Sequence, residues 1–202
     1  MDTVTDTRQR IIDSARELIY ARSYSDVGVQ QICDNAGVKK GSFYHFFPSK
    51  RDLTLAVLDQ LQVFFRDTIL NRAFAADIPP LERIARFFSS IYEFQKQTKA
   101  ATGHILGCPF GNIGCEMSTQ DEALRSRVDA IFRASERPFE QALQAAIDCG
   151  DLPPNIDTAA TARAMFAYAE GIMMYAKTRN DPELIRDLGQ RALQLAVPVD
   201  RQ

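Results

Sequence analysis

A histidine and a cysteine four residues apart, His104 and Cys108, carry the most reactive chemistry in this sequence. They lie in "TGHILGCPFGNIGCEM", which has four glycines in sixteen residues and predicts a short or irregular helix. On a helix, two residues at this spacing share one face. An imidazolium beside a thiol lowers the thiol pKa and favours a reactive thiolate. The alternative is that Cys108 and Cys115 are small apolar residues packed in a glycine-rich turn.

A metal site or an enzyme active site would need more than these residues. Zinc binding by His104, Cys108 and Cys115 lacks the paired C-x-x-C spacing of zinc-binding segments. A nucleophile–base pair of Cys108 and His104 has no evident third group to orient the base. We therefore expect no metal and no cofactor, and we keep a thiol-dependent enzyme or redox protein as the alternative function.

A second group of residues has the chemistry needed to hold nucleic acid. Residues 37–51, "GVKKGSFYHFFPSKR", contain four Lys or Arg, one His and four aromatic residues, but no acid. The whole chain is slightly acidic, with 24 Lys and Arg against 26 Asp and Glu and a net charge of −2. This balance excludes a protein that coats nucleic acid by bulk charge, and it leaves a local basic surface as the candidate.

Composition places the chain among ordinary folded proteins. It has 202 residues, of which 46% are hydrophobic and 25% are charged. The polar N-terminal segment "MDTVTDTRQR" is no signal peptide, and no apolar run approaches the roughly 18 residues of a membrane span. We expect a cytoplasmic protein without a membrane partner, in which the four cysteines stay reduced.

Helical periodicity runs through nearly the whole chain, and the fold expected is all-α with about nine helices. A small N-terminal helix-turn-helix domain, residues 1–48, precedes a ligand-binding and dimerisation bundle, residues 49–202, and a long helix from residue 50 connects the two. Helix caps are expected at Asp6, Ser49, Thr119, Asp157 and Asp181, and Pro138 should kink its helix. The expected helices span residues 7–22, 29–35, 40–47, 50–75, 81–99, 120–149, 157–177 and 181–197, besides the short one near residue 110.

The helix expected at residues 40–47 has two different faces. Phe43, Phe46 and Phe47 lie at i, i+3 and i+4 and can pack against the two preceding helices. Helix, glycine-containing turn and helix is the helix-turn-helix arrangement, whose second helix enters the major groove. The residues expected to face DNA are Lys39, Lys40, Gly41, Ser42, Tyr44 and His45, together with Lys50 at the start of the next helix.

Three stretches resemble the TetR family of one-component transcriptional regulators: "GVKKGSFYHFFPSKRDL", "QQICDNAGV" and "IDCGDLPPNID". The resemblance is strong over residues 7–65 and looser, mainly in helix number and length, over the remainder. It implies a repressor that binds a palindromic operator in double-stranded DNA as a homodimer and is released by a small-molecule effector. Carried over by position, it implies DNA contacts from Lys40, Gly41, Ser42, Tyr44, His45 and Lys50.

Two positions depart from the family pattern. Family members place Ser or Thr at the position of Gly28, where the hydroxyl caps the second helix and touches a phosphate. Glycine caps nearly as well but has no hydroxyl, which leaves Gln30 to make the contact on that side. Cys33 stands where alanine is usual, and we interpret it as a small buried residue and not as a sensor.

The resemblance also implies that the C-terminal part binds a ligand and dimerises through its last two helices. A wide apolar face fits this role, and an ordinary intramolecular core is the alternative. Its residues are Ala159, Ala162, Phe166, Ala169, Ile172 and Met173, followed by Leu184, Ile185, Leu188, Ala192 and Leu195.

Aromatic residues with a polar partner form the lining that a small organic effector needs. The candidates are Tyr92, Phe110, Phe132 and Phe166, with Glu170 as the polar group. Within the family, a Gly-Cys pair at Cys108 resembles that of members that respond to electrophiles or oxidants. His104 and Lys177 are its candidate neighbours. The sequence leaves open whether Cys108 reacts or only packs.

Overall fold

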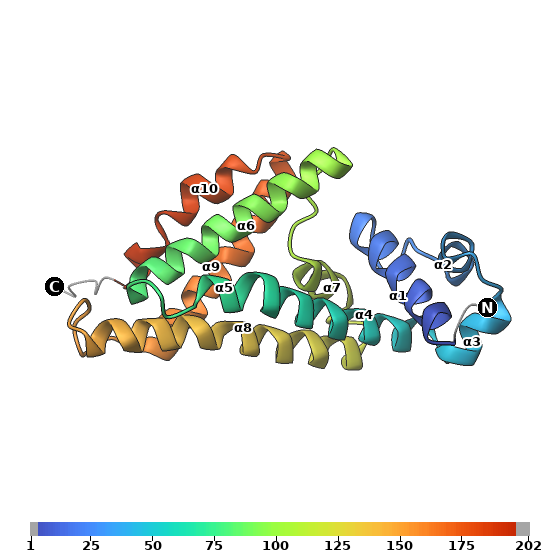
Figure 1. Ribbon diagram of the computed structural model, residues 1–202, viewed down its shortest axis with the longest axis horizontal. Helices are drawn as coiled ribbons and strands as arrows, with labels where there is room; N and C mark the ends of the chain where they lie inside the picture. Colours follow the sequence, from blue (N-terminus) through green and yellow to red (C-terminus); the bar gives the residue numbers. More distant parts are fainter. Residues whose placement is uncertain (1–3, 197–202) are drawn as a thin grey trace. The chain divides into compact units, whose positions relative to one another are not determined.

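The computed structural model describes residues 4–196, and this part of the chain is helical without a single strand (Figure 1). The all-α prediction is confirmed. Because α4, a π-helical turn and α5 follow one another without a break, the described residues form nine separate helices, besides a short 3₁₀ turn at the end. The elements are α1 (Val4–Ala21), α2 (Val29–Ala36), α3 (Lys40–Phe46), α4 (Lys50–Phe65), the π turn (Arg66–Leu70), α5 (Asn71–Ala73), α6 (Pro80–Thr102), α7 (Pro109–Met117), α8 (Glu122–Asp148), α9 (Thr158–Arg179), α10 (Glu183–Gly189) and the 3₁₀ turn (Ala192–Ala196).

The chain forms two compact units. Unit 1 comprises the residues up to Val63 together with Pro109–Ile131, and unit 2 comprises Phe64–Cys108 and the residues from Phe132 onward. Unit 1 therefore contains α1, α2, α3 and α7 with the first parts of α4 and α8. The division by compactness differs from the predicted functional division at residue 48, which stays a prediction. Each helix between residues 4 and 196 is too short or too polar to span a lipid bilayer.

The helix-turn-helix of unit 1 packs around aromatic and branched side chains. Phe43 and Phe47 are buried as predicted, whereas Phe46 is half-buried. α1 packs against both α2 and α3 and contributes two fully buried isoleucines, Ile11 and Ile12. Cys33 is buried in this core, which confirms its reading as a small packing residue. The burial of one face leaves the other face of α3 for a partner.

The turn between α2 and α3 depends on a glycine. Gly37 caps α2 in the left-handed conformation, with φ 64°, and donates its backbone N–H to Asp34. Glycine adopts this conformation without the steric cost that a side chain would add. Arg10 on α1 donates to the carbonyls of Ala36 and Gly37 at 2.6 and 3.1 Å, so the turn is also fixed from the first helix.

Of the five predicted helix caps, two are confirmed and three are wrong. At α10 the N-cap is Pro182, although Asp181 accepts the backbone N–H of Glu183 at 3.1 Å. The Ser49 hydroxyl accepts from the backbone N–H of Asp52 at 3.2 Å, and Asp157 accepts from Ala160 at 2.9 Å. Asp6 lies inside the first turn of α1, where its carboxylate faces the positive end of the helix dipole instead of capping it. At α8 the cap is Asp121 and not Thr119, because its carboxylate accepts from the first backbone N–H groups of the helix.

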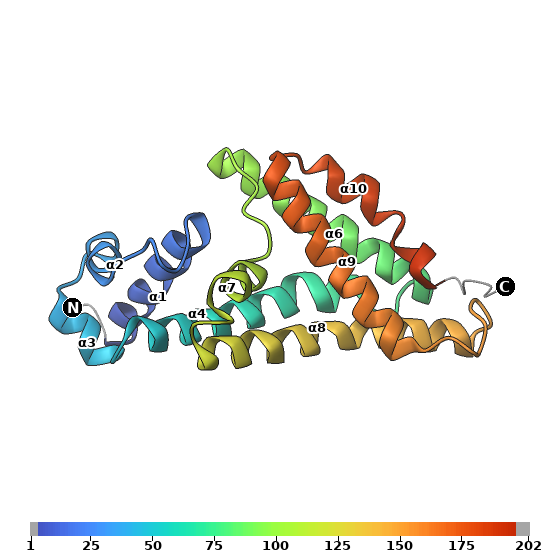
Figure 2. The same cartoon turned by 180° about the vertical axis from the view of Figure 1, so that it is seen from behind.

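Unit 2 is a helical bundle with an aromatic centre. α10 packs on both α6 and α9, an arrangement visible from opposite sides in Figures 1 and 2. The rings of Phe87 and Phe139 pack edge to face with their centroids 4.8 Å apart. The ring centroids of Phe74 and Phe139 are 4.9 Å apart. The α9 residues assigned from the sequence to a dimer interface are mostly part of this core. Ala162, Phe166, Ala169, Ile172 and Met173 are buried inside the bundle, so this assignment is wrong.

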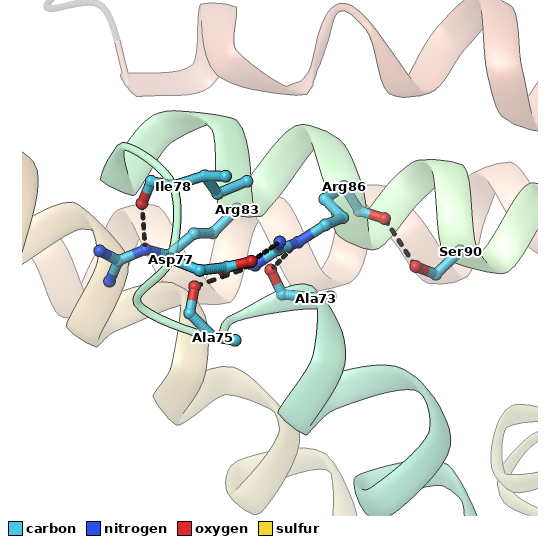
Figure 3. A network of polar contacts seen from close by, with 7 residues as sticks. All are labelled: Ala73, Ala75, Asp77, Ile78, Arg83, Arg86 and Ser90. Carbon is cyan, nitrogen blue, oxygen red and sulfur yellow. Dashed lines mark hydrogen bonds and ion pairs between the residues drawn. The ribbon is translucent and has the colours of Figure 1, made fainter.

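One arginine closes the end of the long helix that runs from α4 through the π turn to α5 (Figure 3). Arg86 on α6 donates to the carbonyls of Ala73 and Ala75, both at 2.9 Å, and forms an ion pair with Asp77 at 2.8 Å. The last carbonyls of a helix have no partner within the helix, and a guanidinium can satisfy several of them at once. Arg86 therefore ties α5 to α6.

The final helix is shorter than predicted. α10 ends at Gly189, and the residues from Ala192 form a 3₁₀ turn in place of one helix over residues 181–197. A Cβ added at Gly189 would lie 2.7 Å from Phe88, so glycine permits the close approach of α10 to α6. Glycine also disfavours helix continuation, which explains the break at this point. Residue 197, the end of the predicted helix, lies outside the described residues.

Candidate nucleic-acid interface and effector segment

The face of α3 opposite the core carries the residues predicted to meet DNA. Lys39, Lys40, Gly41, Tyr44 and His45 are exposed, and Ser42 is half-buried beside them. Tyr44 is 53% exposed, although its ring packs edge to face against that of Phe43, with ring centroids 5.1 Å apart. Lys39 occupies the N-cap position of α3, and Lys40 is the first residue of the helix. Both lysines therefore lie at its N-terminal end, where base-reading residues of a helix-turn-helix lie.

Gly41 has no role in packing within the protein. A Cβ placed there would meet no atom within 4 Å among the described residues. Glycine in a helix costs about 1 kcal/mol relative to alanine, and no internal contact here requires its absence of a side chain. The open space lies on the face of α3 that carries Lys40 and His45.

At the start of α2, one half of a capping box forms without the hydroxyl that Gly28 lacks. The side-chain oxygen of Gln31 accepts the backbone N–H of Gly28 at 2.7 Å, which forms one half of a capping box. Gln30 is exposed and donates to Asp34 on the same helix at 2.7 Å. The predicted phosphate contact of Gln30 would therefore compete with a hydrogen bond inside α2.

Lys50 is engaged within unit 1. Its ammonium group donates to the carbonyls of Tyr24 and Val27 at 2.9 and 3.1 Å and lies 4.1 Å from the centre of the Tyr24 ring. Burial lowers its pKa, and the negative charge of Glu116 opposes that shift. The structure thus gives Lys50 a role in holding the loop before α2, while its phosphate contact stays a prediction.

Sequence reasoning missed Glu116, which binds the same loop. Its two carboxylate oxygens accept the backbone N–H groups of Tyr24 and Ser25 at 2.8 and 2.7 Å. The residue lies near the end of α7, and 91 positions separate it from Ser25. No local sequence signal marks such a contact, because it depends on how α7 packs in unit 1.

The segment that contains His104 and Cys108 is not helical. Residues 103–108 connect α6 to α7, and α7 begins only at Pro109. The premise that a four-residue spacing places His104 and Cys108 on one helix face is therefore wrong, and His104 is exposed. Glycines at 103 and 107 have positive φ angles, of 82° and 74°, which explains why the helical pattern fails here.

Two amide side chains fix the course of this connection. Gln95 on α6 donates to the carbonyl of Gly107 at 2.9 Å and accepts its N–H at 3.3 Å. Asn180, which caps α9, accepts the N–H of Ile105 at 2.9 Å and donates to Gly103 at 3.0 Å. The segment expected to be irregular is therefore held at defined points between α6 and α9.

Cys108 meets the carboxyl group of Glu170 on α9. The thiol forms a side-chain hydrogen bond to this carboxyl group. Burial raises the pKa of Glu170 to about 7, and the hydrogen bond from Cys108 opposes this shift in part. Among the described residues, no cationic side chain contributes to this pKa shift. A carboxyl group in this state exchanges a proton near neutral pH.

The other predicted effector residues are distributed over several places. Phe132 and Phe166 meet edge to face at 5.2 Å, with Phe166 one helical turn before Glu170 on α9. Tyr92 is buried between α6 and α10, where its hydroxyl donates to Glu183 at 2.8 Å. Phe110 is buried in unit 1, and Lys177 is exposed on α9. Within residues 4–196, no group of three His, Cys, Asp or Glu side chains is arranged to hold a metal ion.

Family models match both parts of the chain. Residues 11–57 match the model of the bacterial regulatory proteins of the tetR family, which covers α2 and α3. Residues 80–191, more than half of the chain, match the tetracyclin repressor-like C-terminal domain. The chain belongs to the TetR family of transcriptional regulators. As a TetR-family protein it regulates transcription, so the alternative of a thiol-dependent enzyme is excluded.

Individual relatives agree with this placement of the TetR-family chain. The transcriptional regulator AcuR of Cereibacter sphaeroides is 32% identical over 176 residues, which cover 87% of this chain and 78% of AcuR. The repressor DhaR of a Mycobacterium species is 27% identical over 179 residues, covering 89% of this chain and 86% of DhaR. The crystal structure of a TetR regulatory protein from Rhodobacter sphaeroides superposes with a TM-score of 0.82 at 29% identity, over 94% of this chain and 98% of that one.

Proposed function

We propose that this TetR-family protein is a homodimeric repressor that binds a palindromic operator in double-stranded DNA and leaves it when an effector binds unit 2. The observation that carries the proposal is the division of α3 into a buried aromatic face and an exposed face with two lysines, a histidine and no acid. DhaR, which is named a repressor, supports repression over activation. Because the proposed partner is double-stranded DNA and the matching family comprises bacterial regulatory proteins, we propose that this protein acts in the cytoplasm.

The exposed residues of α3 divide into two roles. Lys40 and His45 point away from the core at the helix surface and are assigned to base edges, with Lys39 supporting them at the helix start. Tyr44 and Ser42 flank that row and are assigned to phosphates, as is Gln30 on α2. Base contacts carry sequence information, whereas phosphate contacts fix the position of the protein on the duplex.

Selection of duplexes from a random pool tests DNA binding directly. We expect a palindrome whose half-sites lie roughly 34 Å apart, one turn of DNA, since a symmetric dimer presents two copies of α3. A mobility-shift assay on the selected duplex should then show one discrete complex that a scrambled duplex does not form. Selection of no sequence above background would contradict the proposal.

The proposed dimer uses the exposed face of α9. Small and apolar residues recur there at helical spacing: Ala164, Ala167, Gly171, Met174 and Tyr175. Met174 is 64% exposed and Tyr175 is 40% exposed, so both large side chains are available to a second copy of the chain. Small residues allow two helices to approach closely, and a two-fold axis pairs the same stripe from both copies.

Sedimentation of a charged variant tests this surface. Met174→Arg places a charge on the stripe and should convert a dimer to a monomer at micromolar concentration. Gln141→Arg adds the same charge to an exposed position of α8 and serves as the control. A dimer that persists in Met174→Arg would show that another surface is used.

The proposed effector site centres on Cys108 and Glu170, with Phe132 and Phe166 as its aromatic part. The thiol and the carboxyl group are hydrogen-bonded, and Phe166, one turn before Glu170 on α9, contacts Phe132 on α8. Polar and apolar groups of a candidate site therefore lie in one unit. Tyr92 is omitted because its hydroxyl is bound to Glu183. His104, Phe110 and Lys177 stay predictions from the sequence.

Labelling with N-ethylmaleimide tests the role of Cys108. The expected result is that modification releases the operator from wild type but not from Cys108→Ser. Cys115 and Cys149 are exposed and provide internal controls, since both remain in the variant. Release that persists in Cys108→Ser would remove Cys108 from the effector site.

A further inference from the structure

The loop between α1 and α2 is held by two side chains of opposite charge. The carboxylate of Glu116 accepts hydrogen bonds from the N–H groups of Tyr24 and Ser25. The ammonium group of Lys50 donates hydrogen bonds to the carbonyls of Tyr24 and Val27. Every one of these four hydrogen bonds is 3.1 Å or shorter. Backbone groups in a surface loop are ordinarily satisfied by water, so this degree of fixation is unusual for a connection.

The charges on both side chains favour this arrangement. Burial opposes ionisation of Glu116, but hydrogen bonds from Ser25, Tyr24 and Ser23 outweigh it and keep its pKa below the ordinary value. The same carboxylate acts on Lys50 and favours its charged form against the effect of burial. Charge-assisted hydrogen bonds are roughly twice as strong as neutral ones. Glu116 and Lys50 therefore act on the loop together.

The loop leads directly into the helices that carry the DNA-facing residues. Val27 precedes Gly28, the N-cap of α2, and α2 packs on α3. Val27 is fully buried, so the loop cannot shift without disturbing the core of the helix-turn-helix. The position of α3 within unit 1 thus depends on where α7 and the first turn of α4 hold this loop.

We propose that Glu116 is a positioning residue for DNA recognition, acting through the backbone of Tyr24 and Ser25 to fix α2 and α3 against α7. It touches no DNA itself. The inference rests on the proposed DNA binding by α3 and adds a residue that the α3 sequence pattern does not contain. Glu116 and Lys50 together form a clamp on the loop between α1 and α2. The proposal assigns Lys50 to this clamp and not to a phosphate.

The clamp gives α7 a part in regulation. α7 starts at Pro109, directly after Cys108, and Glu116 lies in its last turn. The helix has nine residues and is about 13 Å long at 1.5 Å per residue. A displacement of α7 would move the Glu116 carboxylate from the two amides and release the loop.

Measuring affinity for both the selected operator and a scrambled duplex distinguishes a positioning role of Glu116 from a general effect of its negative charge. Glu116→Ala should lower affinity for the selected operator by roughly tenfold or more, the size of a lost charged hydrogen bond, with little change for a scrambled duplex. Glu122→Ala removes the same charge from an exposed residue at the start of α8 and is the matched control. If both variants strengthened binding to every duplex alike, Glu116 would act through charge and the proposal would be overturned.

Hydrogen exchange tests the clamp without DNA. The amides of Tyr24 and Ser25 should exchange slowly in wild type and at least tenfold faster in Glu116→Ala, because that variant removes their acceptor. Equal protection in both proteins would overturn the clamp. Glu116→Gln, which keeps a neutral acceptor, should fall between the two and serves if Glu116→Ala does not fold. A wild type that selects no duplex would contradict the proposed function, and the exchange rates would still decide whether Glu116 holds the loop.

Discussion

The thiol of Cys108 donates a hydrogen bond to the carboxyl group of Glu170, a residue 62 positions later in the chain on α9. The contact joins a cysteine just before α7 to a carboxyl group whose pKa burial raises to about 7. A protonated and an ionised Glu170 are thus both populated near neutral pH. The thiol stabilises the ionised form, so the two groups influence each other.

Glu170 should make stability fall as pH rises. Its pKa is about 7 when folded and near 4.5 when unfolded, so the folded state binds the proton more tightly between these values. Stability contributed by this proton is present below about pH 4.5 and is lost as pH rises through 7. Glu170→Gln should therefore gain roughly 3 kcal/mol of stability relative to wild type as the pH rises from 4.5 to 8. Urea unfolding at several pH values measures this.

The Cys108 hydrogen bond supplies a second arm of the same experiment. Cys108→Ala removes the group that lowers the pKa of Glu170, so this pKa should rise further, and the loss of stability should be larger and extend to higher pH than in wild type. A loss of the same size over the same pH range in Cys108→Ala, or parallel curves for Glu170→Gln and wild type, would contradict the coupling.

Gly41→Ala should separate folding from DNA binding. The added methyl meets no atom of the described residues, and alanine favours helix over glycine by about 0.5–1 kcal/mol, so the protein should be slightly more stable. The same methyl would occupy space needed by DNA and should weaken operator binding by roughly 1–3 kcal/mol, the size of one base contact. Thermal unfolding and fluorescence anisotropy measure the two effects. A more stable variant with unchanged operator affinity would show that DNA does not approach Gly41.

Lys50→Met should destabilise the fold more than the loss of another nearby lysine. It removes hydrogen bonds to two loop carbonyls, and bonds to charged groups contribute about 1.5–3 kcal/mol each. Lys40→Met makes the same chemical change at an exposed position and should change stability by less than about 0.5 kcal/mol. Equal unfolding free energies in urea for the two variants would mean that the loop does not need Lys50.

Lys40 and Tyr44 should differ in how they affect sequence preference. Lys40→Ala removes a group assigned to base edges and should change which bases are preferred, by about 1–3 kcal/mol for each lost base contact. Tyr44→Phe removes a hydroxyl assigned to phosphate and should weaken binding to all duplexes similarly. Repeating the duplex selection with each variant checks the assignment, and a changed preference in Tyr44→Phe alone would reverse it.

The sequence by itself determined the helices of the DNA-binding part and the two faces of α3. Phe43 and Phe47 are buried and Tyr44 and His45 are exposed because the period of a helix fixes which residues share a side. The turn at Gly37 could also be predicted from the local sequence, since glycine readily adopts the left-handed conformation that ends α2. The family followed from the same residues, because their contacts lie within a short stretch of chain.

Tertiary structure decided the partners of residues far apart in sequence. Periodicity identified an apolar face on α9 but did not show whether this face packs against the rest of the bundle or against a second copy of the chain. In the structure, Phe166 and Met173 are buried in the bundle. The spacing of His104 and Cys108 suggested a pair, but backbone angles at Gly103 and Gly107 turned the chain away from helix. Cys108 bonds to Glu170, and Glu116 to the loop at Ser25, because packing brings separate helices together. Such contacts leave no periodic signal in a single sequence, since each partner is set by how whole helices pack.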